Sequence, residues 1–115
     1  MKPFLGETMV VYRVEKDRMG PYRSRQADLQ RMYDAHNVRF HPTPQVDCGK
    51  EPELNEVCGF KSIQDLQKWF YGFRTSLRKL GFKVHVYEAE PTAIGNKQLL
   101  FKDRESHLIK TLVLK

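Results

Sequence analysis

Two places early in the chain put an aromatic residue directly before an arginine: Tyr12-Arg13 and Tyr22-Arg23. The guanidinium group of arginine is a planar fork of N–H donors that matches phosphate oxygens, and a neighbouring ring can stack on a base. His41 follows in an irregular stretch and adds a third aromatic ring with hydrogen-bonding nitrogens. We therefore expect these five residues to line one nucleotide-binding surface.

A structural role for the first arginine is the alternative. Arg13 falls in the middle of an expected strand, where a long charged side chain needs either an acceptor or a route to solvent. Glu15 on the same strand, or Glu88 on a later one, could provide the acceptor. In that case Arg13 holds the sheet together and does not contact a ligand.

Four residues of types that bind zinc or act as nucleophiles occur between positions 36 and 58: His36, His41, Cys48 and Cys58. Structural zinc sites usually pair ligands two to four residues apart, whereas here four, six and nine residues intervene. We therefore expect no metal site. Cys58 precedes an expected helix start, which can favour a thiolate, but packing in the core is the preferred interpretation.

A row of lysines is the basis of a second binding hypothesis. On an unbroken helix Lys61, Lys68 and Lys79 fall within about 20° of one another at 100° per residue. Such a row could meet the phosphates of a nucleic acid. The alternative is an ordinary solvated helix face, because the aromatic residues of this helix lie on its apolar side.

The segment 62–88 is expected to organise the fold. Ser62 can cap a helix, and apolar residues then recur at spacings of three and four. The members of this stripe are Ile63, Leu66, Trp69, Phe70, Phe73, Leu77 and Leu80. Gly72 predicts a kink or a split of the helix, and Gly81 predicts a left-handed stop before a strand at 82–88.

The remaining elements fit around this segment. We expect strands at 9–15, 98–101 and 107–114, and a helix from Ser24 to about His36. Residues 1–8 are expected to be a frayed lead-in, and residues 37–57 a long loop. The prediction is a single α+β domain over residues 1–115, with a largely antiparallel sheet of about four to five strands packed against two helices.

Composition narrows the class of partner. The formal charge of +6 favours anionic partners such as nucleotides, nucleic acid or an acidic protein surface. No apolar run approaches the ~20 residues of a membrane span, and the N-terminal stretch lacks a signal-peptide core. We therefore expect a cytoplasmic protein that does not bind membranes and whose cysteines are reduced.

Several segments taken together resemble small uncharacterised proteins encoded by bacteriophages and prophages. These segments are VYRVE, GPYR, CGFKSIQDLQKWF, LGFKVHVYEAE and KQLLF, which span most of residues 9–101. The resemblance implies an accessory protein that acts on host machinery or host defences. It also implies that the protein works in the cytoplasm of the bacterial host.

A second resemblance is to ADP-ribosyltransferases, through the aromatic-arginine strand at Tyr12-Arg13. That family places a catalytic glutamate at the start of a late strand, where this chain has Gln98 in KQLLF. The resemblance therefore implies either a non-catalytic relative that still binds a nucleotide, or an enzyme that uses Glu88 or Glu90.

The sequence leads to three hypotheses. The preferred one is a phage-type accessory protein without a required cofactor, which binds a host protein or a nucleotide through Tyr12, Arg13, Tyr22, Arg23, His41 and Gln98. The second is an NAD-dependent ADP-ribosyltransferase-like enzyme. The third is a nucleic-acid-binding protein that uses Lys61, Lys68 and Lys79.

Overall fold

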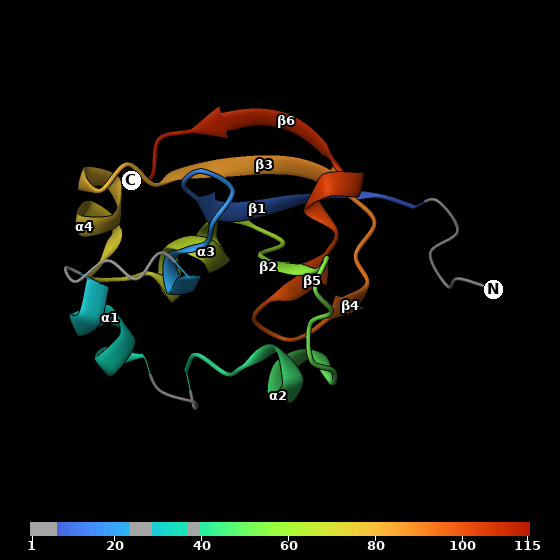
Figure 1. Ribbon diagram of the computed structural model, residues 1–115, viewed down its shortest axis with the longest axis horizontal. Helices are drawn as coiled ribbons and strands as arrows, with labels where there is room; N and C mark the ends of the chain where they lie inside the picture. The colour runs from blue at the N-terminus through green and yellow to red at the C-terminus, as the bar shows by residue number, and fades with distance from the viewer. Residues whose placement is uncertain (1–6, 24–28, 37–39) are drawn as a thin grey trace.

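The computed structural model describes residues 7–23, 29–36 and 40–115 of the chain. Within these ranges six strands form two three-stranded antiparallel sheets, accompanied by four short α-helices (Figure 1). The elements in chain order are β1 (Met9–Glu15), η1 (Pro21–Arg23), α1 (Gln30–Ala35), α2 (Pro44–Cys48), β2 (Val57–Gly59), α3 (Ile63–Trp69), α4 (Arg74–Lys79), β3 (Lys83–Ala89), β4 (Ala93–Ile94), β5 (Leu99–Phe101), η3 (Asp103–Glu105) and β6 (His107–Leu112). The predicted α+β class is confirmed, with the strands divided between two sheets.

The first sheet has the order β1-β3-β6, with β3 in the centre (Figure 1). In the β1–β3 pair Val14 lies opposite Val84, and Arg13 lies opposite His85. Side chains alternate between the faces of a strand, so the two valines lie on one face and Arg13 and His85 on the other. The valine face packs into the larger hydrophobic cluster together with helical residues. The other face carries Tyr87 to the second sheet.

The second sheet has the order β2-β5-β4, and its central strand β5 is fully buried. It joins the first sheet through a backbone pair between Tyr12 and Phe60, with both N–H···O distances at 2.8 Å. Gly59 makes this approach possible, because a Cβ atom there would lie 2.5 Å from Val11 Cγ1. The strand β2 begins inside the stretch expected to be loop.

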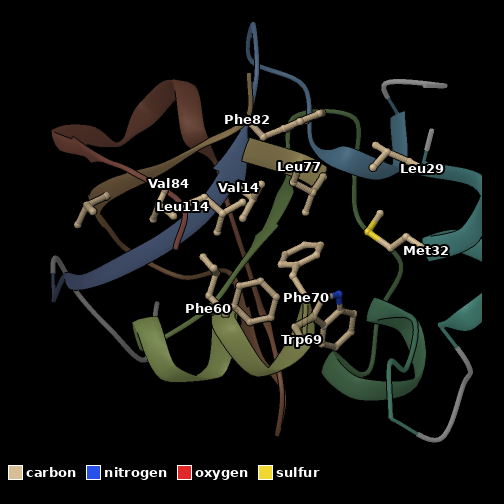
Figure 2. Packing of buried hydrophobic residues seen from close by; sticks show 12 residues of the cluster. Val14, Leu29, Met32, Phe60, Trp69, Phe70, Leu77, Phe82, Val84 and Leu114 are labelled. Carbon is tan, nitrogen blue, oxygen red and sulfur yellow. The ribbon is translucent and has the colours of Figure 1, made fainter. Parts of the chain in front are cut away.

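The apolar stripe of the central segment forms the main core, as the sequence predicts. The hydroxyl of Ser62 accepts the N–H of Asp65 at 3.1 Å, which caps α3. Gly72 has a φ of +87° and separates α3 from α4, and Gly81 has a φ of +98° before β3. Figure 2 shows Trp69, Phe70 and Phe60 side by side in the core, and the centroids of the Phe60 and Trp69 rings are 5.4 Å apart.

The expected loop at 37–57 contains a helix that the sequence analysis missed. The Thr43 hydroxyl accepts the N–H of Val46, Pro44 occupies the first turn of α2, and Gly49 ends the helix with a φ of +79°. A proline disfavours helical backbone at the residue before it, but it is itself favoured at the first helical position, where its missing N–H is not needed. The pattern Thr-Pro followed by glycine five residues later was therefore the missed signal.

The first helix is shorter in the described residues than the sequence predicts. α1 begins at Gln30, and the predicted start at Ser24 lies outside the described residues, as do residues 1–6 and 37–39. β6 ends at Leu112, two residues before the predicted end.

In the part of the chain that the structure describes, no helix has the length and apolar character needed to cross a membrane.

Candidate functional site

A cavity of about 380 Å³ lies where the turn after β1, the segment around α2 and the end of α3 meet. Five of the six residues predicted for the ligand site line it: Arg13, Tyr22, Arg23, His41 and Gln98. Tyr12 does not line the cavity, because its side chain packs against the larger hydrophobic cluster. The tertiary structure therefore brings together residues as far apart in the chain as Arg13 and Gln98. Ligand binding by these residues stays a prediction.

Arg13 reaches the cavity wall but is held by intramolecular hydrogen bonds. Its Nε donates to Glu15 Oε2 at 2.8 Å, and its Nη1 donates to the carbonyl oxygen of Cys58 at 2.7 Å. The Arg13 side chain is only 11% exposed, and the Glu15 side chain is fully buried. The structural alternative, in which Arg13 pairs with Glu15, is therefore what the structure contains. Arg13 fixes the cavity wall and has limited capacity left for a ligand.

Glu15 is the centre of a buried polar network between the two sheets. Its Oε1 accepts the Tyr87 hydroxyl at 2.5 Å and lies 2.8 Å from His85 Nδ1. Burial alone would raise the pKa of Glu15. The hydrogen bond from Tyr87 and the charge and hydrogen bond of Arg13 outweigh burial, so the pKa of Glu15 lies below its usual value. Glu15 is therefore an ionised carboxylate that orients Arg13.

An aromatic cluster forms another wall of the cavity. The Trp69 Nε1–H donates to the Tyr22 hydroxyl at 2.7 Å, and this hydroxyl lies 2.5 Å from His36 Nδ1. Since Trp69 uses the hydroxyl as an acceptor, the Tyr22 hydroxyl hydrogen is free to be donated to His36 Nδ1. The carbonyl oxygen of Trp69 lies 2.9 Å from His41 Nε2, which must therefore carry the hydrogen. These bonds fix the ring tautomers of His36 and His41.

The two histidines leave one nitrogen each without a partner. The rings of His36 and His41 are stacked, with centroids 3.8 Å apart and planes within 6°. His36 Nε2 and His41 Nδ1 are buried and have no hydrogen-bond partner. With the tautomers above, the first is a donor and the second an acceptor. Burial and the neighbouring His41 lower the pKa of His36 to about 4, so His36 is neutral near pH 7.

Tyr22 is 46% exposed, but its hydroxyl group lies inside this cluster. Burial of that group raises the pKa of Tyr22 well above its usual value of 10. The phenol is therefore a neutral hydrogen-bond bridge between Trp69 and His36, and Tyr22 lines the cavity. Arg23 follows Tyr22 at the end of η1 and is exposed.

Gln98 occupies the position that the resemblance to ADP-ribosyltransferases assigns to a catalytic glutamate. Its Nε2 donates to the carbonyl oxygen of Pro42 at 2.7 Å, and the residue is 5% exposed. This bond ties β5 to the segment before α2, which gives Gln98 a structural role in shaping the cavity. Glu88 and Glu90, the other candidates for that carboxylate, do not line the cavity.

The thiols and metal-capable side chains are dispersed. Among residues 7–23, 29–36 and 40–115, no group of three or more His, Cys, Asp or Glu side chains is placed to hold a metal ion. Cys58 lines the cavity, whereas Cys48 donates its thiol hydrogen to the carbonyl oxygen of Gln98 at 3.4 Å. Burial raises the pKa of both thiols, that of Cys48 to about 11, so neither is a thiolate at pH 7.

The lysine row of the sequence analysis depended on an unbroken helix, and that premise is wrong. Lys61 precedes α3, Lys68 lies on α3 and Lys79 lies at the end of α4. The positive φ of Gly72 separates the two helices, so the three side chains do not follow one helical face. All three lysines are exposed, and nucleic-acid binding by them stays a prediction.

Sequence reasoning did not assign several of the lining residues to the ligand site, among them His36, Trp69, Glu56 and Cys58. Trp69 was assigned to the core from its helical spacing, and it serves both roles because its indole edge reaches the cavity. Glu56 carries a pKa of about 2, since the hydrogen bonds from the Glu53 N–H and Lys50 outweigh its burial. No short-range pattern marks Glu56, because its partners come together only in the folded loop.

The structure is that of a small α+β protein whose cavity is lined by aromatic rings and arginines. Residues 9–115 match the model of the family described as Bacteriophage T4 Y00F protein, and the chain belongs to this family. It is therefore a small phage protein, as the first resemblance implies. The match gives no support to the resemblance to ADP-ribosyltransferases. No curated protein and no solved structure matches the chain.

Proposed function

We propose that this phage protein is a non-catalytic binding protein whose cavity takes a nucleotide, with a planar base and at least one phosphate. The observation that carries the proposal is that Tyr22, Trp69 and His41 line the same cavity as Arg23. A volume of about 380 Å³ lies in the range of small-molecule sites. Such sites are mostly apolar and contain a few placed polar groups.

The chemistry of the walls suits the two halves of a nucleotide. The unpartnered His36 N–H and His41 nitrogen offer a donor and an acceptor to the edge of a base, once a small ring movement exposes them. Arg23 is the exposed cation available to a phosphate, because Arg13 is already bonded to Glu15 and to a carbonyl oxygen. The binding is therefore expected to depend on Arg23 more than on Arg13.

The state of the carboxylate in the cavity wall favours a binding role over ribosyl transfer. Glu56 is the carboxylate of the cavity wall, and its Oε1 already lies 2.9 Å from Lys50 Nζ and accepts a backbone N–H. A carboxylate engaged in this way is poorly placed to stabilise a positively charged sugar. Within an infected bacterium, such a protein would sequester a nucleotide that host machinery or host defences use.

Calorimetric titration with mono-, di- and cyclic nucleotides and NAD tests the proposal. We expect saturable binding of at least one nucleotide, weakened at least about tenfold by Arg23→Ala, since charge-assisted bonds contribute about 1.5–3 kcal/mol. Arg104→Ala is the matched control, because Arg104 is an exposed arginine on η3 that does not line the cavity. Absence of binding by every nucleotide, or equal binding by both variants, contradicts the proposal. Consumption of NAD would favour the enzyme hypothesis instead.

A further inference from the structure

A second hollow lies next to the cavity and shares His41 and Trp69 with it. It has a volume of about 570 Å³, and its other walls include Phe40, Tyr71, Lys68 and Lys97. We propose that this hollow, here called the Phe40–Tyr71 groove, binds single-stranded nucleic acid. The proposal rests on the groove's own residues and does not require the cavity to bind a free nucleotide.

Two exposed aromatic rings are the first part of the argument. Tyr71 is 76% exposed and Phe40 is 56% exposed, although large aromatic side chains gain most from burial. Proteins that bind single strands use such rings as platforms on which successive bases stack, because every base has a flat π-face. Tyr71 is the second residue after α3, outside the buried stripe, and Gly72 then turns the chain with a positive φ. Its helical spacing places this ring on the side away from the apolar stripe, where it is exposed to solvent.

Two cations are the second part of the argument. Lys68 comes from the last turn of α3, and Lys97 comes from the turn between β4 and β5. Within residues 7–23, 29–36 and 40–115, neither ammonium group forms an ion pair. Asp65 also lines the groove and offsets part of this charge. Rings flanked by unpaired lysines complement a strand that alternates bases with phosphates.

The turn that carries Lys97 is held rigidly by α2. The carboxylate of Asp47 accepts the backbone N–H groups of Asn96, Lys97 and Gln98, with its shortest distances at 2.9, 3.1 and 2.9 Å. A Cβ atom at Gly95 would approach the Asp47 carboxylate within 2.4 Å, so only glycine fits there. The backbone of Lys97 is therefore positioned before any ligand arrives, which reduces the ordering cost of binding. Asp47 is a positioning residue in this scheme.

Fluorescence anisotropy with a labelled oligothymidylate of about ten nucleotides tests the groove. We expect binding that weakens steeply between about 50 and about 200 mM salt. Tyr71→Ala should weaken it roughly 5- to 150-fold, and Tyr71→Phe, which keeps the ring, should retain most of it. Lys97→Ala should lower the slope of log affinity against log salt by about 1. Lys110→Ala, an exposed lysine on β6 that does not line the groove, should leave affinity within about twofold.

Several results would overturn the proposal. These are no anisotropy change at the lower salt concentration, equal affinity of Tyr71→Ala and the wild type, or equal effects of Lys110→Ala and Lys97→Ala. A polyglutamate peptide that competes as well as the oligonucleotide would indicate an acidic protein partner. The nucleotide titration separates this test from the preceding one. Arg23→Ala should impair nucleotide binding in the cavity, whereas Tyr71→Ala should impair only oligonucleotide binding in the groove.

Discussion

His36 and His41 lie face to face, with ring centroids 3.8 Å apart and ring planes within 6° of parallel. The first ring follows α1 and the second precedes α2, so the stack joins two segments of the cavity wall. Protonation of one ring places a positive charge against the other in a partly buried setting, which disfavours the folded state. The stacked pair should therefore make the folded state less stable at acidic pH.

The first prediction concerns pH. The pKa of His36 falls from its usual 6.5 to about 4 on folding, so the unfolded chain binds the proton more readily. The stability from neutral His36 is therefore complete above pH 6.5 and is lost as the pH falls towards 4. We expect the thermal midpoint to fall across this window, and His36→Phe, which keeps an aromatic ring, to show a shallower decline. The contribution of Glu56 falls mainly between pH 4.5 and about 2, a lower window.

An equal pH dependence in wild type and His36→Phe would show that His36 does not titrate with folding. His107→Phe serves as the control, because His107 is an exposed histidine on β6. This substitution removes a histidine that lies outside the stacked His36–His41 pair.

The second prediction concerns the buried network between the sheets. Glu15→Gln keeps the shape of the side chain but removes the charge that neutralises Arg13. We expect a loss of roughly 3 kcal/mol in the free energy of unfolding, because one partner of a buried ion pair is left uncompensated. Urea denaturation of the variant measures this loss. Glu88→Gln, an exposed glutamate on β3, should change it by less than about 0.5 kcal/mol.

The same network limits what Arg13 variants can reveal. Arg13→Ala leaves the buried carboxylate of Glu15 without its guanidinium partner, so it should destabilise the domain as well as alter the cavity. Loss of ligand binding in that variant would therefore be ambiguous. This is the reason that Arg23 carries the binding test.

The third prediction concerns Trp69, which is 9% exposed. Trp69→Ala should cost about 3–5 kcal/mol, because it opens a hole between Phe60 and Phe70. Trp69→Phe should cost less, since the ring volume is largely kept and the main loss is the bond to Tyr22, at about 1 kcal/mol. Chemical denaturation measures both values. Trp69 is the sole tryptophan, and a red-shifted native emission that quenchers reach would contradict its burial.

The fourth prediction concerns the break between α3 and α4. Gly72 has a φ of +87°, and no atom lies within 4 Å of where a Cβ would be placed. Gly72→Ala should therefore cost about 1–2 kcal/mol from backbone strain alone, and Gly72→Asn should cost less. Thr75→Ala, on the exposed side of α4, is the matched control and should be nearly neutral. If Gly72→Ala is as stable as the wild type, the positive φ does not persist in solution.

The local sequence determined where several strands and helices begin and end. The strand at Met9–Glu15 has its predicted bounds, and Ser62, Gly72 and Gly81 mark the start, the break and the end of the central helical segment. These features depend on neighbours within a few residues, namely capping, periodicity and the conformational freedom of glycine.

Tertiary structure alone decided what these elements do together. Whether Arg13 bonds to Glu15 or to a ligand depends on how deeply β1 is buried, and burial between two sheets makes the ion pair necessary. Gln98 was matched to a catalytic position, yet its amide donates to Pro42, which is fifty-six residues away. Tyr71 and Lys97 line one groove although twenty-six positions separate them in the chain. Such contacts join residues far apart in the chain, and no local pattern encodes them.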